Sequence, residues 1–280
     1  INRVVYDITS KPPSTIELEK SEIMNKIKNI LRKKNKFKIV CLTAYSKNIA
    51  EIIDKHADIV LVGDSLGSVL YNYQTTRKVT LTEMINHSKS VRLGVKKSLM
   101  VVDMPYKTYD TNSLALKNAK KIMQETKCDA VKLEGGKKII KQINFLIKNK
   151  IPVMGHLGLL PQTAKGKFRS KGNTNREIKQ LMNDALLLEK SGVFSIVLEC
   201  IKTPLAKKIS QSLKIPTIGI GSSVHCDGQV LVTDDLIGLN VTNIRFVKKF
   251  LDLRKYINVG IKKFSSEVRS KRYPTKKHSY

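Results

Sequence analysis

Short β-rich runs alternate with helical stretches along most of the chain, and this alternation constrains the fold more than any other feature. A parallel strand pair needs a long crossover connection, so strand–helix alternation indicates a parallel sheet with helices outside it. Several runs, such as IVLVG and SIVL, are apolar on both faces, as helix-covered strands are. We predict strands at 37–43, 58–64, 98–103, 129–134, 151–155, 194–199, 216–220 and 235–239, and helices near 46–56, 82–93, 112–126, 137–149, 176–191, 203–213 and 244–256.

Eight strands within 280 residues favour an α/β fold with a single (β/α)8 TIM barrel. A doubly wound open sheet is the alternative, but the first strand–helix turn contains no G-x-G-x-x-G sequence. Residues 1–35 predict a polar, basic lead-in with a helix at 15–31, and residues 265–280 predict a basic C-terminal tail. We therefore expect one domain over residues 1–280.

The chain is strongly basic, with 52 Lys and Arg residues against 23 Asp and Glu residues and a net charge of +29. Nucleic-acid binding is one explanation for such an excess. Most of the basic residues are lysines scattered along the chain, whereas arginine is preferred for phosphate and base recognition. We expect a solvated surface that attracts anions without specificity, and no specific nucleic-acid partner.

The sequence predicts a cytoplasmic protein without a membrane segment. No apolar run approaches the ~20 residues that span a bilayer, and no signal peptide pattern is present. The four cysteines, Cys41, Cys128, Cys200 and Cys226, lie far apart and form no C-x-x-C pair. This spacing favours reduced thiols over a disulfide framework or a zinc site.

Five consecutive predicted strands end in ionisable residues. In a (β/α)8 barrel the catalytic groups lie at the carboxyl ends of the strands. An acid that caps the next helix would explain any one of these positions, but not five in succession. The residues at these ends are Asp64 with the neighbouring Ser65, Asp103, Lys132 with Glu134, His156, and Glu199.

The fourth of these strands carries two charges in the sequence DAVKLEGG. Lys132 and Glu134 are two residues apart, so a strand points both to the same side. Burying a charge is costly unless it is paired or has a function. In a barrel both would face the axis near its top, with Val131 and Leu133 packed outward against helices.

Three carboxylates, Asp64, Asp103 and Glu134, would then share one cavity with the ammonium of Lys132. An all-oxygen ligand set without thiols or paired histidines suits Mg²⁺. Such a cation, chelated by a 2-oxo acid, acts as a Lewis acid that stabilises an enolate. Lys132 could pair with the substrate carboxylate, and Glu199 could be the general base. The spacing alone leaves enolate chemistry and carbon–carbon bond chemistry both open.

Seven motifs, in this order, resemble those of the ketopantoate hydroxymethyltransferase family. The similarity extends from about residue 37 to residue 238, and the ending YPTKKHSY (273–280) also resembles the family's ending. The motifs are VGDSLG (62–67), DMPY (103–106), VKLEGG (131–136), PVMGHLGLLPQ (152–162), VLEC (197–200), IPTIGIG (215–221) and CDGQVL (226–231).

The resemblance implies a Mg²⁺-dependent barrel that assembles as a homodecamer. It would transfer a hydroxymethyl group from 5,10-methylene-tetrahydrofolate to 3-methyl-2-oxobutanoate (α-ketoisovalerate), giving ketopantoate in pantothenate biosynthesis. Carried over by position, Asp64 and Asp103 correspond to metal ligands, with Glu134 completing or supporting the metal shell. The resemblance implies substrate contacts from Asp64, Ser65, Asp103 and Lys132, a pocket-lining role for His156, and Glu199 as the general base.

The sequence departs from the family pattern at positions away from these residues. Ser46 stands where an Asp usually follows T-A-Y, Ser222 and Ser223 replace Ala-Gly, Asp234 replaces a His, and the loop 168–173 differs. These changes bear on loop closure and folate affinity rather than on the reaction class.

Two other functions compete with this one. The first is another Mg-dependent 2-oxo acid enzyme of the isocitrate lyase or phosphoenolpyruvate mutase type. Such enzymes generally carry a cysteine in a K-x-C-G loop, which is absent from this sequence. The second is an inactive barrel that serves as a basic binding protein, against which the five polar strand ends argue. A ketopantoate assay with and without Mg²⁺ separates all three.

Overall fold

The computed structural model describes residues 12–164, 169–241 and 243–280. Eight parallel strands form a closed barrel in chain order, and β8 pairs with β1 to complete it. This architecture confirms the predicted (β/α)8 TIM barrel. The strands are β1 (Ile39–Thr43), β2 (Ile59–Val62), β3 (Leu99–Asp103), β4 (Ala130–Glu134), β5 (Val153–Gly158), β6 (Ser195–Glu199), β7 (Thr217–Ile220) and β8 (Gly228–Leu231).

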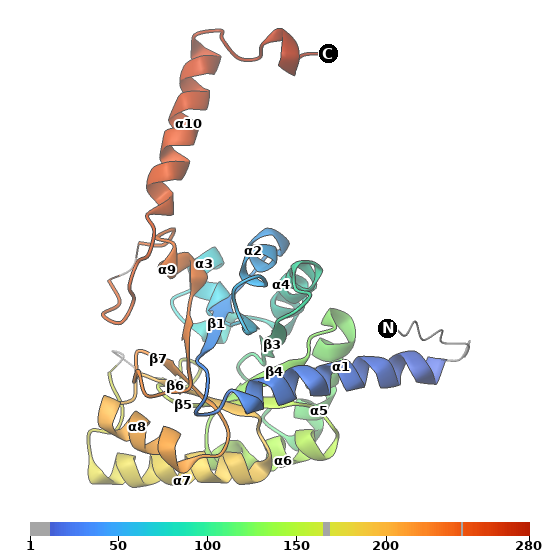
Figure 1. The fold of residues 1–280 in the computed structure, drawn as a ribbon, viewed down its shortest axis with the longest axis vertical. Helices are drawn as coiled ribbons and strands as arrows, with labels where there is room; N and C mark the ends of the chain where they lie inside the picture. Colours follow the sequence, from blue (N-terminus) through green and yellow to red (C-terminus); the bar gives the residue numbers. More distant parts are fainter. Residues whose placement is uncertain (1–11, 165–168, 242) are drawn as a thin grey trace.

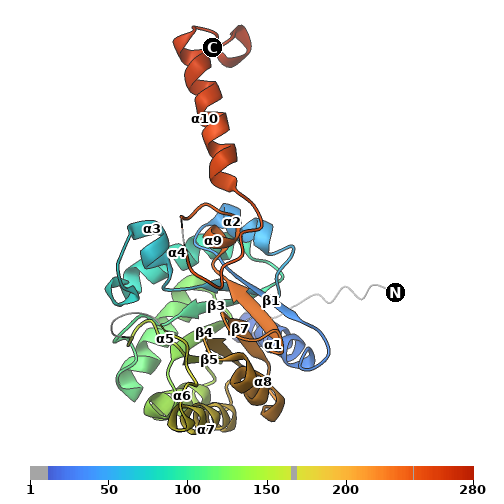
Figure 2. The same ribbon diagram turned by 90° about the vertical axis from the view of Figure 1, so that its left-hand side faces the viewer.

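Helices surround the barrel (Figures 1 and 2). Helices α4 to α7 pack on strands β2 to β6. The α-helices are α1 (Pro12–Arg32), α2 (Lys47–Ile53), α3 (Leu66–Tyr71), α4 (Leu81–Gly94), α5 (Asn112–Thr126), α6 (Ile140–Lys148), α7 (Asn175–Ser191), α8 (Thr203–Ser212), α9 (Thr233–Leu236) and α10 (Leu253–Arg269). Short 3₁₀ helices are η1 (Thr76–Lys78), η2 (Lys137–Ile139) and η3 (Lys276–His278).

The core has two layers that follow the alternation of each strand. In β4, Ala130 belongs to the cluster inside the barrel, whereas Val131 and Leu133 belong to the cluster between strands and helices. Ile27 and Ile30 of α1 join the inner cluster, so the lead-in helix packs against the inside of the barrel at its amino-terminal end. Successive strand residues face opposite sides, which leaves Lys132 and Glu134 on the inner side as predicted.

The predicted last strand at 235–239 is wrong. The eighth strand is β8, and Asp235 lies in the short helix α9. A Cβ on Gly228 would lie 2.4 Å from the carbonyl oxygen of Ile39, so β8 approaches β1 closely through a glycine. Only Val230 and Leu231 of its four residues are apolar, whereas the later residues 235–239 contain a longer apolar pattern and were predicted as the strand instead.

The predicted helix near 244–256 is also wrong, because α10 begins only at Leu253 and continues to Arg269. The N–H groups of Phe250 and Leu253 bond to the carbonyl oxygens of Leu236 and Ile237. The backbone before Leu253 is thus tied to α9 instead of forming its own i→i−4 bonds. Part of the segment predicted as a tail, 265–280, is consequently helical.

Helix α10 projects away from the barrel (Figures 1 and 2) and buries none of its residues. Its apolar side chains are exposed, including Tyr256, Ile257, Ile261 and Phe264. Within the described residues, no helix is both long and apolar enough to span a membrane.

Candidate active site

The barrel brings the polar strand ends to one place. Register pairs Asp103 with Lys132 across β3 and β4, and Glu134 with His156 across β4 and β5. Glu199 ends β6 opposite Gly158. Adjacent strands lie about 4.8 Å apart, so these side chains line neighbouring positions at the carboxyl end of the barrel.

A buried ion pair links two of these strands. Lys132 Nζ lies 2.9 Å from Asp103 Oδ1, and the other oxygen of Asp103 accepts a hydrogen bond from the Asp64 N–H at 3.1 Å. Burial alone would lower the pKa of Lys132, but the charges of Asp103, Glu134 and Asp64 outweigh it and raise that pKa. Lys132 is therefore held as a cation among carboxylates, and Asp64 and Asp103 are held side by side.

Gln162 joins three parts of this site, although the charge pattern of the sequence did not single it out. Its side-chain amide donates to Asp64 Oδ2 at 2.8 Å and to the Met104 carbonyl at 3.0 Å. Its backbone N–H donates to Glu134 Oε2 at 3.0 Å, and its Oε1 accepts from the Tyr109 hydroxyl at 2.5 Å. The only signal for Gln162 in the sequence is its place at the end of the PVMGHLGLLPQ motif.

His156 lies between two carboxylates. Its Nδ1 is 3.6 Å from Glu134 Oε1 and its Nε2 is 3.2 Å from Glu199 Oε2, yet neither nitrogen makes a hydrogen bond with the described residues. Burial and the charge of Lys132 lower the pKa of His156. The side chain of Glu199 is 16% exposed, so it borders the open mouth while His156 stays beneath it.

Ser65 is the N-cap residue of α3 and lies beside the carboxylates, directly after Asp64. The hydroxyl oxygen of Tyr45 is 2.8 Å from Ser65 Oγ, which fixes the serine side chain at the edge of the site.

The carboxylates carry a surplus of buried negative charge. Burial, and then the charge of Asp103, raise the pKa of Asp64 to about 7, and burial with Asp64 raises that of Glu134. A cation would offset this repulsion. Over the described part of the chain, no three His, Cys, Asp or Glu side chains gather into a ready metal cage. The adjacent Asp64 and Asp103 fit Mg²⁺, which is commonly held by one or two carboxylates together with substrate and water.

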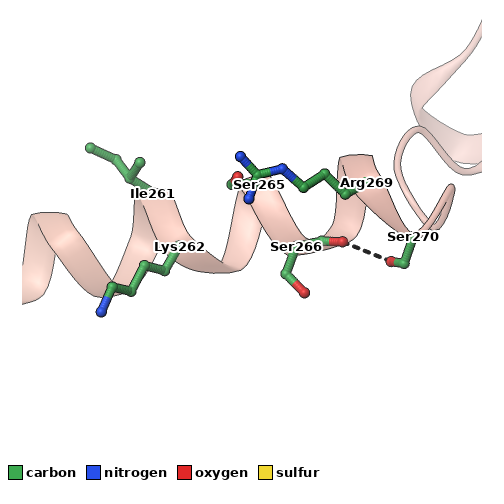
Figure 3. A pocket seen from close by; sticks show the side chains of 6 residues that line it. All are labelled: Ile261, Lys262, Ser265, Ser266, Arg269 and Ser270. Atoms are coloured by element: carbon green, nitrogen blue, oxygen red, sulfur yellow. Dashed lines mark hydrogen bonds between the residues drawn. The ribbon is translucent and has the colours of Figure 1, made fainter.

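A hollow elsewhere on the molecule lies along α10 and is lined by one helix and the residue after it (Figure 3). Its lining residues are Ile261, Lys262, Ser265, Ser266, Arg269 and Ser270. It contains no carboxylate and none of the strand-end residues, so it has no part in the site.

Comparison with known proteins identifies the family. A family model described as ketopantoate hydroxymethyltransferase matches residues 24–276. The chain belongs to this family of one-carbon transferases. A 3-methyl-2-oxobutanoate hydroxymethyltransferase of Pelagibacter ubique (strain HTCC1062) is 64% identical over 255 residues, which cover 91% of this chain and 99% of that protein. A protein of the same name from Rhizobium etli (strain ATCC 51251) is 47% identical, covering 86% of this chain and 90% of the relative.

Solved structures share the fold at low sequence identity. A phosphoenolpyruvate phosphomutase from Streptomyces platensis subsp. rosaceus has a TM-score of 0.59 at 10% identity, covering 90% of this chain and 88% of that one. A phosphonopyruvate hydrolase in complex with oxalate and Mg²⁺ has a TM-score of 0.59 at 8% identity, covering 93% of each chain. These likenesses concern the barrel alone.

Proposed function

We propose that this enzyme transfers a hydroxymethyl group from 5,10-methylene-tetrahydrofolate to 3-methyl-2-oxobutanoate, giving ketopantoate for pantothenate biosynthesis. The observation that carries the proposal is the juxtaposition of Asp64, Asp103 and Lys132 beside Glu199 at the barrel mouth, in a chain of this family. The shared name of its relatives supplies the acceptor and the group transferred.

Asp64 and Asp103 would hold Mg²⁺. Glu134, whose carboxylate accepts a hydrogen bond from the N–H of Gln162, would complete or support the metal shell. Bound there, Mg²⁺ would act as a Lewis acid toward the 2-oxo group of the substrate and stabilise its enolate. Lys132, buried and paired with Asp103, would orient the negatively charged end of the substrate. Ser65, beside Asp64, offers a hydroxyl to the same molecule.

Glu199 would remove the proton from C3 of 3-methyl-2-oxobutanoate. Its partial exposure at the mouth would give it access to the substrate, and His156 Nε2 lies 3.2 Å from its carboxylate. The carbon–carbon bond then forms between C3 and the methylene carbon of the donor. Both bonds between that carbon and the nitrogens of tetrahydrofolate would break. One water would supply the hydroxyl oxygen, and its two protons together with the C3 proton would end on the two nitrogens and on the hydroxyl oxygen.

We further propose a cytoplasmic homo-oligomer, a decamer by family resemblance. Support comes from α10, whose exposed side chains Tyr256, Ile257 and Phe264 would be covered by other subunits. Light scattering during gel filtration measures the subunit number. A monomeric mass would contradict this assignment without affecting the proposed reaction.

The reaction is tested by incubating the purified protein with 3-methyl-2-oxobutanoate and the folate donor, with Mg²⁺ or with a chelator. Ketopantoate is expected only when Mg²⁺ is present. Phosphonopyruvate and 2-methylisocitrate, assayed in parallel, represent the lyase and mutase chemistry of similar barrels. Turnover of either one without ketopantoate formation would replace the proposed function.

A further inference from the structure

A turn next to the active site holds a lysine where glycine is usual. The N–H of Thr108 donates to the carbonyl of Pro105 at 3.1 Å, closing a four-residue turn, and Lys107 has φ of 63° at its third position. A left-handed backbone there favours Gly or Asn, and a lysine costs conformational free energy. Asn118 Nδ2 also donates to the Thr108 carbonyl at 2.7 Å and fixes the turn. The backbone of the turn is thereby held in place, and the side chain of Lys107 is exposed on it.

Two cations meet at the ring of Tyr106 in this turn. Arg77 Cζ lies 5.2 Å from the ring centroid and Lys107 Nζ lies 5.7 Å from it, both within the range of cation–π attraction. Arg77 comes from η1, which follows β2, whereas Tyr106 and Lys107 follow β3. We call Arg77, Tyr106 and Lys107 the rim cluster.

The rim cluster is connected to the carboxylates through a single residue. Arg77 Nε donates to the Gln162 carbonyl at 2.7 Å, and the side chain of Gln162 donates to Asp64. Within the described ranges, neither Arg77 nor Lys107 has an acid within ion-pair distance. Two positive charges thus lie near the mouth without a negative partner from those ranges.

The folate donor of the proposed function carries negative charges that complement the positive charges of the rim cluster. Its one-carbon unit sits at the pteridine end, and its other end carries the carboxylates of one or more glutamate residues. With the one-carbon unit over Glu199, inside the mouth, the glutamyl end must leave across the rim. We propose that the rim cluster binds these glutamyl carboxylates. The inference rests on the proposed function and names the recognition site for the tail of its donor.

Arginine and lysine would act differently on the tail. The planar guanidinium of Arg77, steadied by Gln162 and Tyr106, can bind one carboxylate through two parallel hydrogen bonds. Lys107 contributes a point charge for a carboxylate of the second glutamate, which only a longer tail supplies. Because the protein has a net charge of +29, it attracts any anion weakly, so a specific site must exceed that background.

Tetrahydrofolate with one or with three glutamates is the probe, and calorimetry measures its binding to the full-length Mg²⁺-loaded protein. The parent is expected to bind the triglutamate about fivefold more tightly, the upper range for an exposed ion pair. Lys107→Gly should abolish this preference without lowering the melting temperature, because glycine relieves the left-handed backbone. Arg77→Lys keeps the positive charge but loses the planar guanidinium and its two parallel hydrogen bonds, so it should reduce the preference for the triglutamate.

Lys120→Gln, on the exposed surface of α5, is the matched control because it removes one positive charge away from the rim. It is expected to keep the triglutamate preference. An equal loss in Lys120→Gln and Lys107→Gly would mean non-specific attraction and would overturn the proposal, as would an unchanged preference in Lys107→Gly. Proton exchange at C3 of 3-methyl-2-oxobutanoate, measured without folate, is the second readout. A parallel loss of exchange in Lys107→Gly would assign Lys107 to the 2-oxo acid instead.

The two proposals fail separately. If the parent forms no ketopantoate, the proposed function fails. If the parent forms ketopantoate but binds both tetrahydrofolates equally, only the assignment of the rim cluster fails.

Discussion

The side-chain amide of Gln162 donates a 2.8 Å hydrogen bond to Asp64 Oδ2, joining residues 98 positions apart in the sequence. The same amide also donates to the carbonyl of Met104, so its orientation is fixed from two sides. One oxygen of Asp64 is thereby held in place, and the orientation of the whole carboxylate follows. Gln162 is therefore a positioning residue for the proposed metal ligands.

Gln162→Leu should weaken Mg²⁺ binding by about tenfold or more, the effect of losing one hydrogen bond to a charged group. Calorimetric titration with Mg²⁺ alone measures this without turnover. Tyr109→Phe is the matched control, since it removes only the hydroxyl that donates to Gln162 Oε1 and should have a smaller effect. Unchanged Mg²⁺ affinity in Gln162→Leu would remove the positioning role.

Asp64→Ala and Asp103→Ala should both abolish Mg²⁺-dependent ketopantoate formation, but they should differ in stability. Asp103→Ala leaves the buried ammonium of Lys132 without its direct partner, which costs about 3–5 kcal/mol of unfolding free energy. Asp64→Ala removes a carboxylate that is repelled by Asp103, so it should cost much less. Urea unfolding together with the turnover assay measures both effects. Equal destabilisation would contradict the arrangement of charges, and normal turnover in either variant would contradict the metal assignment.

The sequence predicted those strands and helices in which polar and apolar side chains lie on different faces or at different ends of the element. In β4, charges two residues apart within an apolar run could only face one side, and Lys132 and Glu134 do lie on the inner side. Strand β8 was missed because it has only four residues, and the first two, Gly228 and Gln229, are not typical of a buried strand.

Gln162 was missed for a different reason. It is a neutral residue in a loop, and its importance comes from five hydrogen bonds whose partners are distant in sequence, including Asp64 and Tyr109. Periodicity reports which face of an element is buried, whereas such contacts exist only after the barrel closes. The start of α10 at Leu253 was missed similarly, because tertiary backbone bonds to α9 override local helix propensity.

Stability should depend on Asp227 at acidic pH. Burial by itself would raise the pKa of Asp227, but hydrogen bonds from Lys34 and from the N–H groups of Thr217 and Asn35 lower it. A depressed carboxyl pKa stabilises the folded state above the unfolded value of about 3.9, and this contribution is lost as pH falls through the lower folded value. Asp227→Asn should therefore cost about 1–3 kcal/mol at pH 7.

The cost of Asp227→Asn should stay constant between pH 7 and about pH 5 and shrink below about pH 4, where the carboxylate of the unfolded parent begins to protonate while that of the folded parent stays charged. Urea unfolding at pH 7, 5 and 3.5 measures the difference between the two proteins. A difference that remained constant down to pH 3.5 would show that the charge of Asp227 contributes nothing.

Glu199→Gln tests the general base directly. Proton removal can be followed without the folate donor, as exchange of the C3 proton of 3-methyl-2-oxobutanoate into deuterated water. The variant should lose this exchange by about 10² or more, because an amide cannot accept the proton. It should still bind Mg²⁺ and the 2-oxo acid, since Asp64, Asp103 and Lys132 lie outside β6 and keep their own contacts in the variant.

Near-normal exchange in Glu199→Gln would exclude Glu199 as the base. His156→Gln, made alongside, separates the two neighbours, because Nε2 of His156 is 3.2 Å from Glu199 and buried beneath it. If His156 acts by restraining Glu199, its loss should slow exchange about tenfold at most, while Glu199→Gln lowers it by 10² or more. Because His156 then acts only through Glu199, the double variant should exchange no more slowly than Glu199→Gln alone. A further loss in the double variant would instead give His156 a proton-transfer role of its own.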